Sequence, residues 1–176
     1  YRSILNMGSS WLSREILTAG GFFLFWLVSY FTEKKGESSS LLGWITALLG
    51  LMAIFSMSSI YATSIRPAWA NIHTYIAFFG AALVLGCAGA AALIGHSVKG
   101  QTLAPEVMAV LKKTGYVAAA AVIIPLVYLP VFIGSLRGGE TAAAQAAALL
   151  TSSYLFPLIL RWAISILGVL ILIKTV

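Results

Sequence analysis

Charged residues are scarce in this sequence. Lys, Arg, Asp and Glu together make up 9% of its 176 residues, whereas hydrophobic residues make up 60%. The mean hydropathy is +0.97, well above that of soluble globular domains. Water would not stabilise a folded state of such a chain, so a soluble globular protein is excluded and a membrane protein is indicated.

Cysteine and histidine are also nearly absent. Cys87 is the single cysteine, so it has no partner in the chain for a disulfide bond, an iron–sulfur cluster or a zinc site. The two histidines, His73 and His96, are expected at opposite ends of one helix, roughly 34 Å apart. They cannot ligate the same haem within one chain, so we expect neither haem nor metal here.

Five long apolar stretches fit membrane-spanning helices. Crossing about 30 Å of hydrocarbon takes roughly 20 mostly apolar residues in helical form. The stretches that reach this length are 11–31, 41–64, 73–95, 114–135 and 154–174. A transmembrane β-barrel is excluded because the apolar residues run continuously and do not alternate with polar ones. The sequence therefore predicts an all-α, polytopic transmembrane helix bundle that forms a single domain over residues 1–176.

The basic residues predict the orientation of this bundle. One side carries only lysines: Lys34, Lys35, Lys99, Lys112, Lys113 and Lys174. The other side carries only arginines: Arg2, Arg14, Arg66, Arg137 and Arg161. Because cytoplasmic loops are enriched in basic residues, we expect the lysine-rich loops in the cytoplasm and the N-terminus outside, in a prokaryotic cytoplasmic (inner) membrane. The net charge of +6 then reflects topology, and nucleic acid is excluded because the chain offers no soluble basic surface with exposed aromatics.

Glu15 is the most informative polar residue. An ionisable side chain inside a span is costly and usually faces a partner or a cavity. Glu15 lies about 8 Å into the first predicted span. Residues at helical spacing form one face with an aromatic ring on either side of the carboxylate: Trp11, Glu15, Thr18, Ala19 and Phe22. Such a face suits a flat aromatic ligand that exchanges protons; the alternative is that Glu15 caps the first turn and pairs with an arginine.

A second feature is the link Arg66-Pro67-Ala68-Trp69 between the second and third predicted spans. Pro67 is expected to force Arg66 out of helical geometry and so to end the second helix. Arg66 and Trp69 could then bracket a ligand site or dock a subunit. The alternative is an interfacial turn with Trp69 in the aromatic belt of the membrane.

Arg161 lies near the start of the last predicted span, where its charge must either snorkel outward or find a carboxylate. Glu15 and Glu140 are the only acidic residues expected on that side, so Glu15 is a candidate partner. Pro125 and Pro130 are expected to bend the fourth span. The Ala-rich segment 141–150 is expected to form a short helix on the outer surface.

Together these features resemble one family. The chain is similar to the membrane-anchor subunit of anaerobic dimethyl sulfoxide reductases in the order and spacing of the following segments: Tyr1-Arg2-Ser3, Ser10-Trp11-Leu12-Ser13-Arg14-Glu15-Ile16-Leu17, Arg66-Pro67-Ala68-Trp69 and Leu160-Arg161-Trp162. The resemblance implies an eight-helix protein without haem, of which this chain would supply the third to the seventh helix. The start at Tyr1 without an initiator Met fits this expectation.

The resemblance also implies a function. Such an anchor holds an iron–sulfur electron-transfer subunit and a molybdopterin catalytic subunit on the lipid membrane, oxidises menaquinol near the outer face, and passes the electrons to the iron–sulfur subunit. The anchor alone is not catalytic, and menaquinol is its substrate within the assembled oxidoreductase complex.

The family's quinol-associated glutamate falls on Glu15, which is expected to accept a proton from the quinol. The family's upstream aromatic residue and serine fall on Tyr1 and Ser3. Support for the site or the partner is expected from Arg66, Trp69 and Arg161. The histidine-leucine-glycine element that ends the family's second helix would lie before Tyr1, so the histidine expected to share the site is not in this sequence.

Other classes of function remain open. An anchor of another quinol-linked molybdoenzyme would have the same helices, because the catalytic subunit selects the final substrate. A non-redox transporter would be expected to place charges near mid-membrane or to show broken inverted repeats, whereas the charges here cluster near helix ends. The third alternative is a purely structural scaffold in which Glu15 is only a capping residue.

Overall fold

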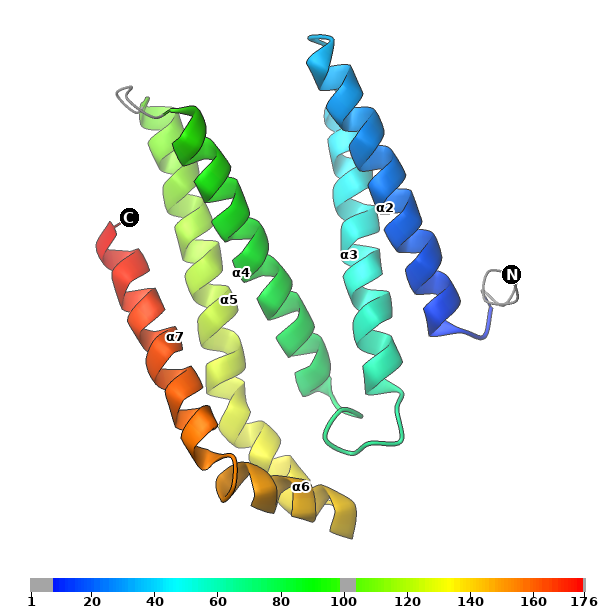
Figure 1. Ribbon diagram of the computed structural model, residues 1–176, viewed down its shortest axis with the longest axis vertical. Coiled ribbons are helices and arrows are strands. Elements are labelled where there is room, and N and C mark those ends of the chain that lie inside the picture. Colours follow the sequence, from blue (N-terminus) through cyan, green and yellow to red (C-terminus); the bar gives the residue numbers. More distant parts are fainter. Residues whose placement is uncertain (1–7, 99–103, 176) are drawn as a thin grey trace. The chain divides into compact units, whose positions relative to one another are not determined.

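The computed structural model describes residues 8–98 and 104–175, and every regular element within them is a helix (Figure 1). The helices are α2 (Trp11–Lys34), α3 (Ser40–Ala62), α4 (Ile72–Ser97), α5 (Pro105–Arg137), α6 (Thr141–Thr151) and α7 (Leu155–Thr175). The predicted all-α fold is confirmed. The chain divides into two compact units, Tyr1–Ile65 with α2 and α3 (unit 1) and Arg66–Val176 with α4 to α7 (unit 2).

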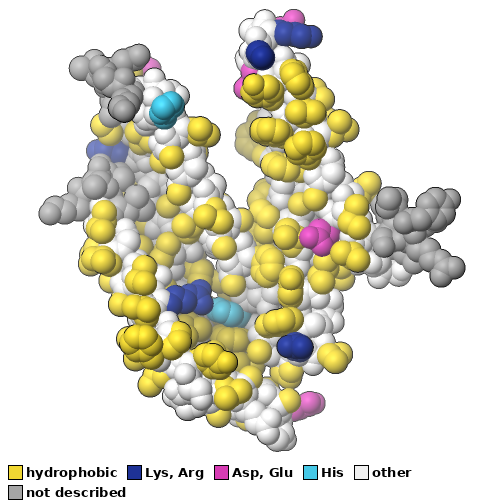
Figure 2. All heavy atoms as spheres, in the orientation of Figure 1, with side chains coloured by type: hydrophobic (Ala, Val, Ile, Leu, Met, Phe, Trp, Pro, Cys, Tyr) yellow, Lys and Arg dark blue, Asp and Glu magenta, His cyan; other side chains and the backbone are white. Residues whose placement is uncertain are grey.

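Four helices, α2 to α5, are long and apolar enough to cross a membrane. The helices α6 and α7 form a pair bent by 65°, which makes a fifth span if the pair is counted as one. Figure 2 shows hydrophobic side chains spread over the surface of both units, with few charged side chains among them. A surface of this kind is expected of helices that face lipid.

Unit 1 is an antiparallel helix pair (Figure 1). The turn between α2 and α3 contains Gly36 with a φ of +82°, a left-handed conformation that favours glycine. Further along the pair, Gly50 of α3 lies directly against the ring of Phe22, because a Cβ at this glycine would come within 3.2 Å of two ring carbons. The missing side chain lets the aromatic ring pack against the backbone of α3.

Unit 2 is arranged around α5, which lies between α4 and α7 (Figure 1). The helix continues through both Pro125 and Pro130. Because Pro125 has no N–H, the carbonyl of Ala121 loses its helical donor. Gly80 of α4 approaches this same carbonyl, since a Cβ at Gly80 would come within 3.0 Å of Ala121 O and of Pro125 Cγ. The glycine therefore allows α4 to lie against the proline-modified turn of α5.

The predicted helix at 141–150 is present as α6. Its alanine face is buried against α5: Ala143 is 5% exposed and Ala147 is 0% exposed. These alanines form one core cluster with Leu129, Phe132 and Leu136 of α5. The small side chains of α6 thus serve a close helix contact within unit 2.

Candidate functional site

The beginning of α2 forms an aromatic and cationic cluster with α3. The guanidinium of Arg14 lies 4.4 Å from the centre of the Trp11 ring. A nitrogen of Arg14 also donates a hydrogen bond to the carbonyl of Gly8 at 2.8 Å. On its other contact, Trp11 meets Phe55 of α3 edge to face, with ring centres 5.6 Å apart and planes at 77°. These contacts hold the Trp11 ring between its own helix start and α3.

A cavity of about 410 Å³ lies beside this cluster, between α2 and α3. Its lining is apolar except for a guanidinium and two hydroxyl-bearing side chains: Trp11, Arg14, Leu17, Thr18, Met52, Phe55 and Ser56. The hydroxyl of Thr18 donates to the carbonyl of Arg14 at 2.7 Å and is thereby occupied. A cavity of this volume lies within the range of small-molecule sites and can admit a flat ring.

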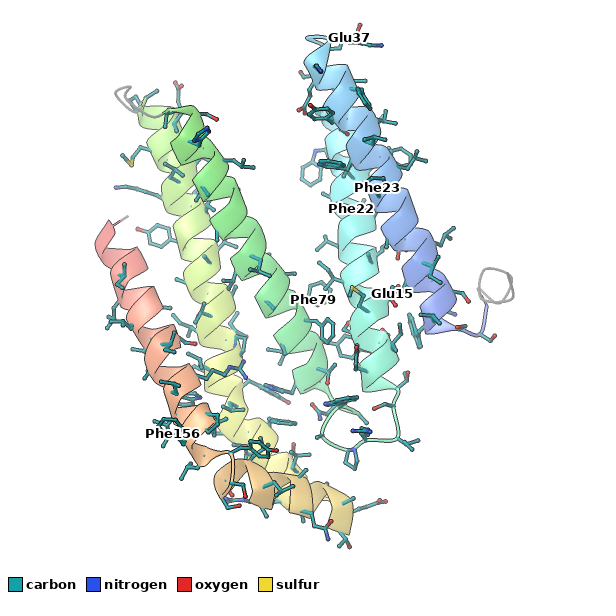
Figure 3. The ribbon with its side chains drawn as sticks, in the orientation of Figure 1. Glu15, Phe22, Phe23, Glu37, Phe79 and Phe156 are labelled. Carbon is teal, nitrogen blue, oxygen red and sulfur yellow. The ribbon has the colours of Figure 1, made fainter. Side chains whose placement is uncertain are left out.

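Glu15 lies at the edge of this cavity. It follows Trp11 by four positions, which turns it about 40° around the helix, so the two side chains lie on the same side of α2. Figure 3 shows Glu15 in the first turns of the helix and Phe22 further along it. The predicted face is therefore divided: Trp11 and Thr18 line the cavity, Glu15 is half-buried next to them, and Phe22 packs against Gly50.

The capping role that the sequence left open for Glu15 belongs to Ser10. Ser10 is the N-cap of α2, and its hydroxyl accepts a hydrogen bond from the N–H of Ser13 at 3.4 Å. Glu15 is the fifth residue of α2, and the first turn contains no acidic side chain. Tyr1 and Ser3, the other residues expected at this site, lie outside the described residues.

Three residues of the cavity were missed by the sequence analysis: Arg14, Phe55 and Ser56. Arg14 could have been found, because it follows Trp11 by three positions and three-residue spacing brings helical side chains together. Phe55 and Ser56 come from α3, and no spacing in the sequence indicates which turn of α3 faces Trp11.

In unit 2 the structure brings Arg66 and Trp69 together. The guanidinium of Arg66 lies 5.1 Å from the centre of the Trp69 ring. The carbonyl of Arg66 accepts hydrogen bonds from the N–H groups of Trp69 at 2.9 Å and Ala70 at 3.0 Å. The expected link is thus a tight turn in which arginine and tryptophan stack.

Asn71 fixes this turn to the start of α4. Its Oδ1 accepts a hydrogen bond from the N–H of His73 at 2.8 Å, which makes it the N-cap. Its Nδ2 donates to the carbonyls of Pro67 at 3.2 Å and Ala68 at 3.1 Å. The side chain therefore joins helix and turn through both of its polar atoms.

Pro67 does not end the second helix, so that expectation is wrong. The helix α3 ends at Ala62, with Thr63 as its C-cap. The N–H and the hydroxyl of Thr63 both bond to the carbonyl of Ser59, at 3.0 and 2.7 Å. Local capping by Thr63 ends the helix before the restriction imposed by Pro67 applies.

His73 lies in an aromatic stack that the sequence did not indicate. Its ring is nearly parallel to the ring of Phe132, with centres 4.2 Å apart, and to that of Tyr128, with centres 6.0 Å apart. Its Nδ1 atom is buried and makes no hydrogen bond within the part of the chain that the structure describes. Because Tyr128 and Phe132 belong to α5, only the packing of α4 on α5 creates this stack.

Arg161 lies in α7, close enough to His73 for an electrostatic interaction. Its neighbour Trp162 packs against the core of α5 and α6, with a buried Nε1 atom that makes no hydrogen bond among the described residues. Glu15 belongs to unit 1 and Arg161 to unit 2, so their pairing stays a prediction. Over residues 8–98 and 104–175, no three His, Cys, Asp or Glu side chains gather as metal ligands.

Comparison with known proteins links this chain to one family. Residues 1–176 match the model of the DMSO reductase anchor subunit (DmsC). The sequence is 31% identical over 98 residues to the anaerobic dimethyl sulfoxide reductase protein YnfH of Escherichia coli, a match that covers 53% of this sequence and 34% of the relative. It is 26% identical over 83 residues to the C subunit of the anaerobic dimethyl sulfoxide reductase of Haemophilus influenzae, which covers 45% and 30%. The matched segments span about a third of each relative's length, and no solved structure matches the sequence.

Proposed function

The chain belongs to the family of DMSO reductase anchor subunits, and from this premise we propose that it oxidises menaquinol at the start of α2. It is a multi-pass membrane protein. Its partners in this proposal are an iron–sulfur electron-transfer subunit, which receives the electrons, and a molybdopterin catalytic subunit, which reduces the final acceptor. The proposed location is the cytoplasmic (inner) membrane of a prokaryote, with the lysine-rich loops in the cytoplasm.

The observation that carries this proposal is the placement of Glu15 at the edge of the α2–α3 cavity. An ionisable residue in a membrane span is costly, so its retention favours a role in proton transfer. Glu15 is half-buried, and its carboxylate forms no hydrogen bond or ion pair with the described residues. A carboxylate in this condition can accept a proton from a bound hydroxyl group.

The chemistry of the quinol fits the groups around the cavity. Oxidation of menaquinol to menaquinone releases two electrons and two protons. The flat ring of the headgroup can lie against the aromatic rings of Trp11 and Phe55, and the Arg14 guanidinium can donate to a quinol oxygen. Glu15 then takes a hydroxyl proton and passes it to water. The electrons leave through the iron–sulfur subunit, because no side chain of this protein carries them.

Further residues are assigned a supporting role in this proposal. Arg66 and Trp69 form a rigid cationic and aromatic turn at the start of unit 2, which suits contact with a partner subunit. Tyr1, Ser3 and Arg161 are assigned to support of the quinol site or of the partner on the strength of the family resemblance.

The test is Glu15→Gln in the full-length protein within the assembled complex. We expect quinol-dependent reduction of dimethyl sulfoxide to fall about 100-fold or more, because the amide cannot accept the proton. A matched control is Glu33→Gln, which removes a carboxylate at the other end of the same helix and should leave the rate unchanged.

Assembly is measured separately with an artificial electron donor that reduces the iron–sulfur subunit directly. This activity should be equal in wild type and Glu15→Gln. Unchanged quinol oxidation in Glu15→Gln at equal assembly would falsify the proton-acceptor role and leave a structural anchor.

A further inference from the structure

Unit 2 contains an elongated apolar groove. The helices α4 and α7 both pack on α5, but among the described residues they do not pack on each other. Between them lie two cavities of about 440 and 350 Å³. Val84, Val122 and Ser165 line both cavities, so these form one continuous groove with α5 as its floor.

The groove has the dimensions of a single hydrocarbon chain. Along α4 it runs from Ala77 to Ala91, a distance of about 21 Å at the rise of a helix. This is comparable to one leaflet, about half of the ~30 Å hydrocarbon core. The residues that keep it open have small side chains or none: Ala77, Gly80, Ala88, Gly115, Ala118 and Gly168. Their small size leaves a space that apolar side chains of unit 2 do not fill.

A positive charge lies at one end of this groove. Arg161 lines the cavity that begins at Ala77, and its side chain is exposed. Unit 2 has only two carboxylates in its described part, Glu106 in the first turn of α5 and Glu140 at the start of α6. Neither forms an ion pair with Arg161 in that part of the chain. The charge of Arg161 is therefore uncompensated beside an apolar groove, which is a costly arrangement in a membrane.

Other polar groups lie near the same end. Ser165 follows Arg161 by four positions, so both side chains lie on the same face of α7. His73 precedes Ala77 by four positions on α4 and is close enough to Arg161 to interact electrostatically. On the face of unit 2 visible in Figure 2, a basic side chain adjoins a histidine among apolar side chains. This end of the groove is thus polar and cationic, whereas its length is apolar.

We propose that this groove binds one acyl chain of an anionic phospholipid, with the lipid phosphate paired to the guanidinium of Arg161. A guanidinium binds phosphate through two parallel hydrogen bonds, and the ion pair removes the uncompensated charge. The acyl chain fills the space between α4 and α7 and joins these helices. A quinol tail would fit the same length, but the quinol headgroup is neutral and would leave the charge uncompensated. The lipid site is independent of quinol oxidation at Glu15.

The experiment is native mass spectrometry of the anchor subunit, released in the gas phase from the full complex in mild detergent. The complex is first exposed to equal amounts of phosphatidylglycerol and phosphatidylcholine. Wild type should retain one phosphatidylglycerol in clear preference to phosphatidylcholine. Arg161→Gln should lower this retention at least tenfold, whereas Arg161→Lys should restore much of it.

Two matched pairs of variants separate the site from general effects. Arg137→Gln also removes an arginine of unit 2, but Arg137 does not line the groove, so retention should be unchanged. Gly168→Leu fills the groove without a clash, because a Cβ at Gly168 meets no atom within 4 Å. Gly86→Leu also meets open space but lies outside the groove lining. Retention should fall in Gly168→Leu and persist in Gly86→Leu.

Three results would overturn the proposal. The first is equal retention of phosphatidylglycerol by wild type and Arg161→Gln. The second is wild type that retains no phospholipid, as expected if another helix occupies the groove. The third is co-purified menaquinone that is lost in Gly168→Leu while phosphatidylglycerol is retained. Because Gly168→Leu leaves the charge of the protein unchanged, the test stands even if Arg161→Gln fails to assemble.

Discussion

Units 1 and 2 each carry an arginine next to a tryptophan near the start of an apolar helix, but at different spacing. In α2, Arg14 follows Trp11 by three positions, and its guanidinium lies 4.4 Å from the ring centre. In α7, Arg161 directly precedes Trp162, and adjacent helical residues do not face each other. The first arginine is accommodated within its own helix start. The second is left beside a groove, where a molecule from outside the protein can neutralise it.

The two units also differ in how their helices approach each other. In unit 1 the close contact is between Gly50 and the ring of Phe22, a side chain that can shift. In unit 2 it is between Gly80 and the backbone carbonyl of Ala121, which is fixed in α5. The difference implies that unit 2 tolerates less change at its helix contact than unit 1.

The largest effect is therefore expected from substitution of these glycines. Gly80→Leu should lower the free energy of unfolding by about 3 kcal/mol, and Gly50→Leu by about 1 kcal/mol, because only the first side chain meets backbone atoms. The measurement is unfolding of the full-length protein in detergent, followed by circular dichroism. Gly86→Leu is the control, since a Cβ there meets no atom within 4 Å. Equal losses at Gly50 and Gly80 would contradict the comparison.

A smaller effect is expected at the helix caps. Asn71 makes three hydrogen bonds through its side chain, the shortest at 2.8 Å, whereas the N-cap bond of Ser10 is 3.4 Å long. Asn71→Ala should cost about 2 kcal/mol and Ser10→Ala about 0.5 kcal/mol. Hydrogen exchange of the amides in the first turns of α4 and α2 measures both. Faster exchange in α2 of Ser10→Ala than in α4 of Asn71→Ala would reverse the expected order.

The smallest effect compares the two arginines directly. Arg14→Gln should cost about 1 kcal/mol, because it removes the stack on Trp11 and the hydrogen bond to Gly8. Without anionic lipid, Arg161→Gln should change the unfolding free energy little. Thermal unfolding in detergent measures both variants, with Arg137→Gln as the control. A larger loss for Arg161→Gln than for Arg14→Gln would show that Arg161 has a stabilising contact within the protein.

Much of the fold follows from the sequence because length and hydropathy are local properties. The apolar stretch 11–31 lies within α2, and the Ala-rich stretch 141–150 lies within α6. The sequence analysis was wrong about Pro67, since it could not reveal that Thr63 caps α3 four residues earlier. A capping hydroxyl competes with a proline only where both lie near a helix end.

The candidate site was predictable only in part. Glu15 and Trp11 were identified because they belong to one helix, where spacing decides which side chains are neighbours. Arg14 lies in the same motif and was overlooked. Phe55 and Ser56, by contrast, reach the cavity from α3, and their contribution depends on how the two helices pack.

By itself, the sequence determined that this protein is an all-α membrane protein with a carboxylate near the start of an apolar helix. Tertiary structure alone decided that Phe132 stacks on His73 and that α4 and α7 flank a groove ending at Arg161. The physical reason is that hydropathy fixes which segments are helices, whereas in lipid nearly every helix face is apolar. Which faces meet is then decided by small residues such as Gly80, whose fit can be judged only against the neighbouring helix.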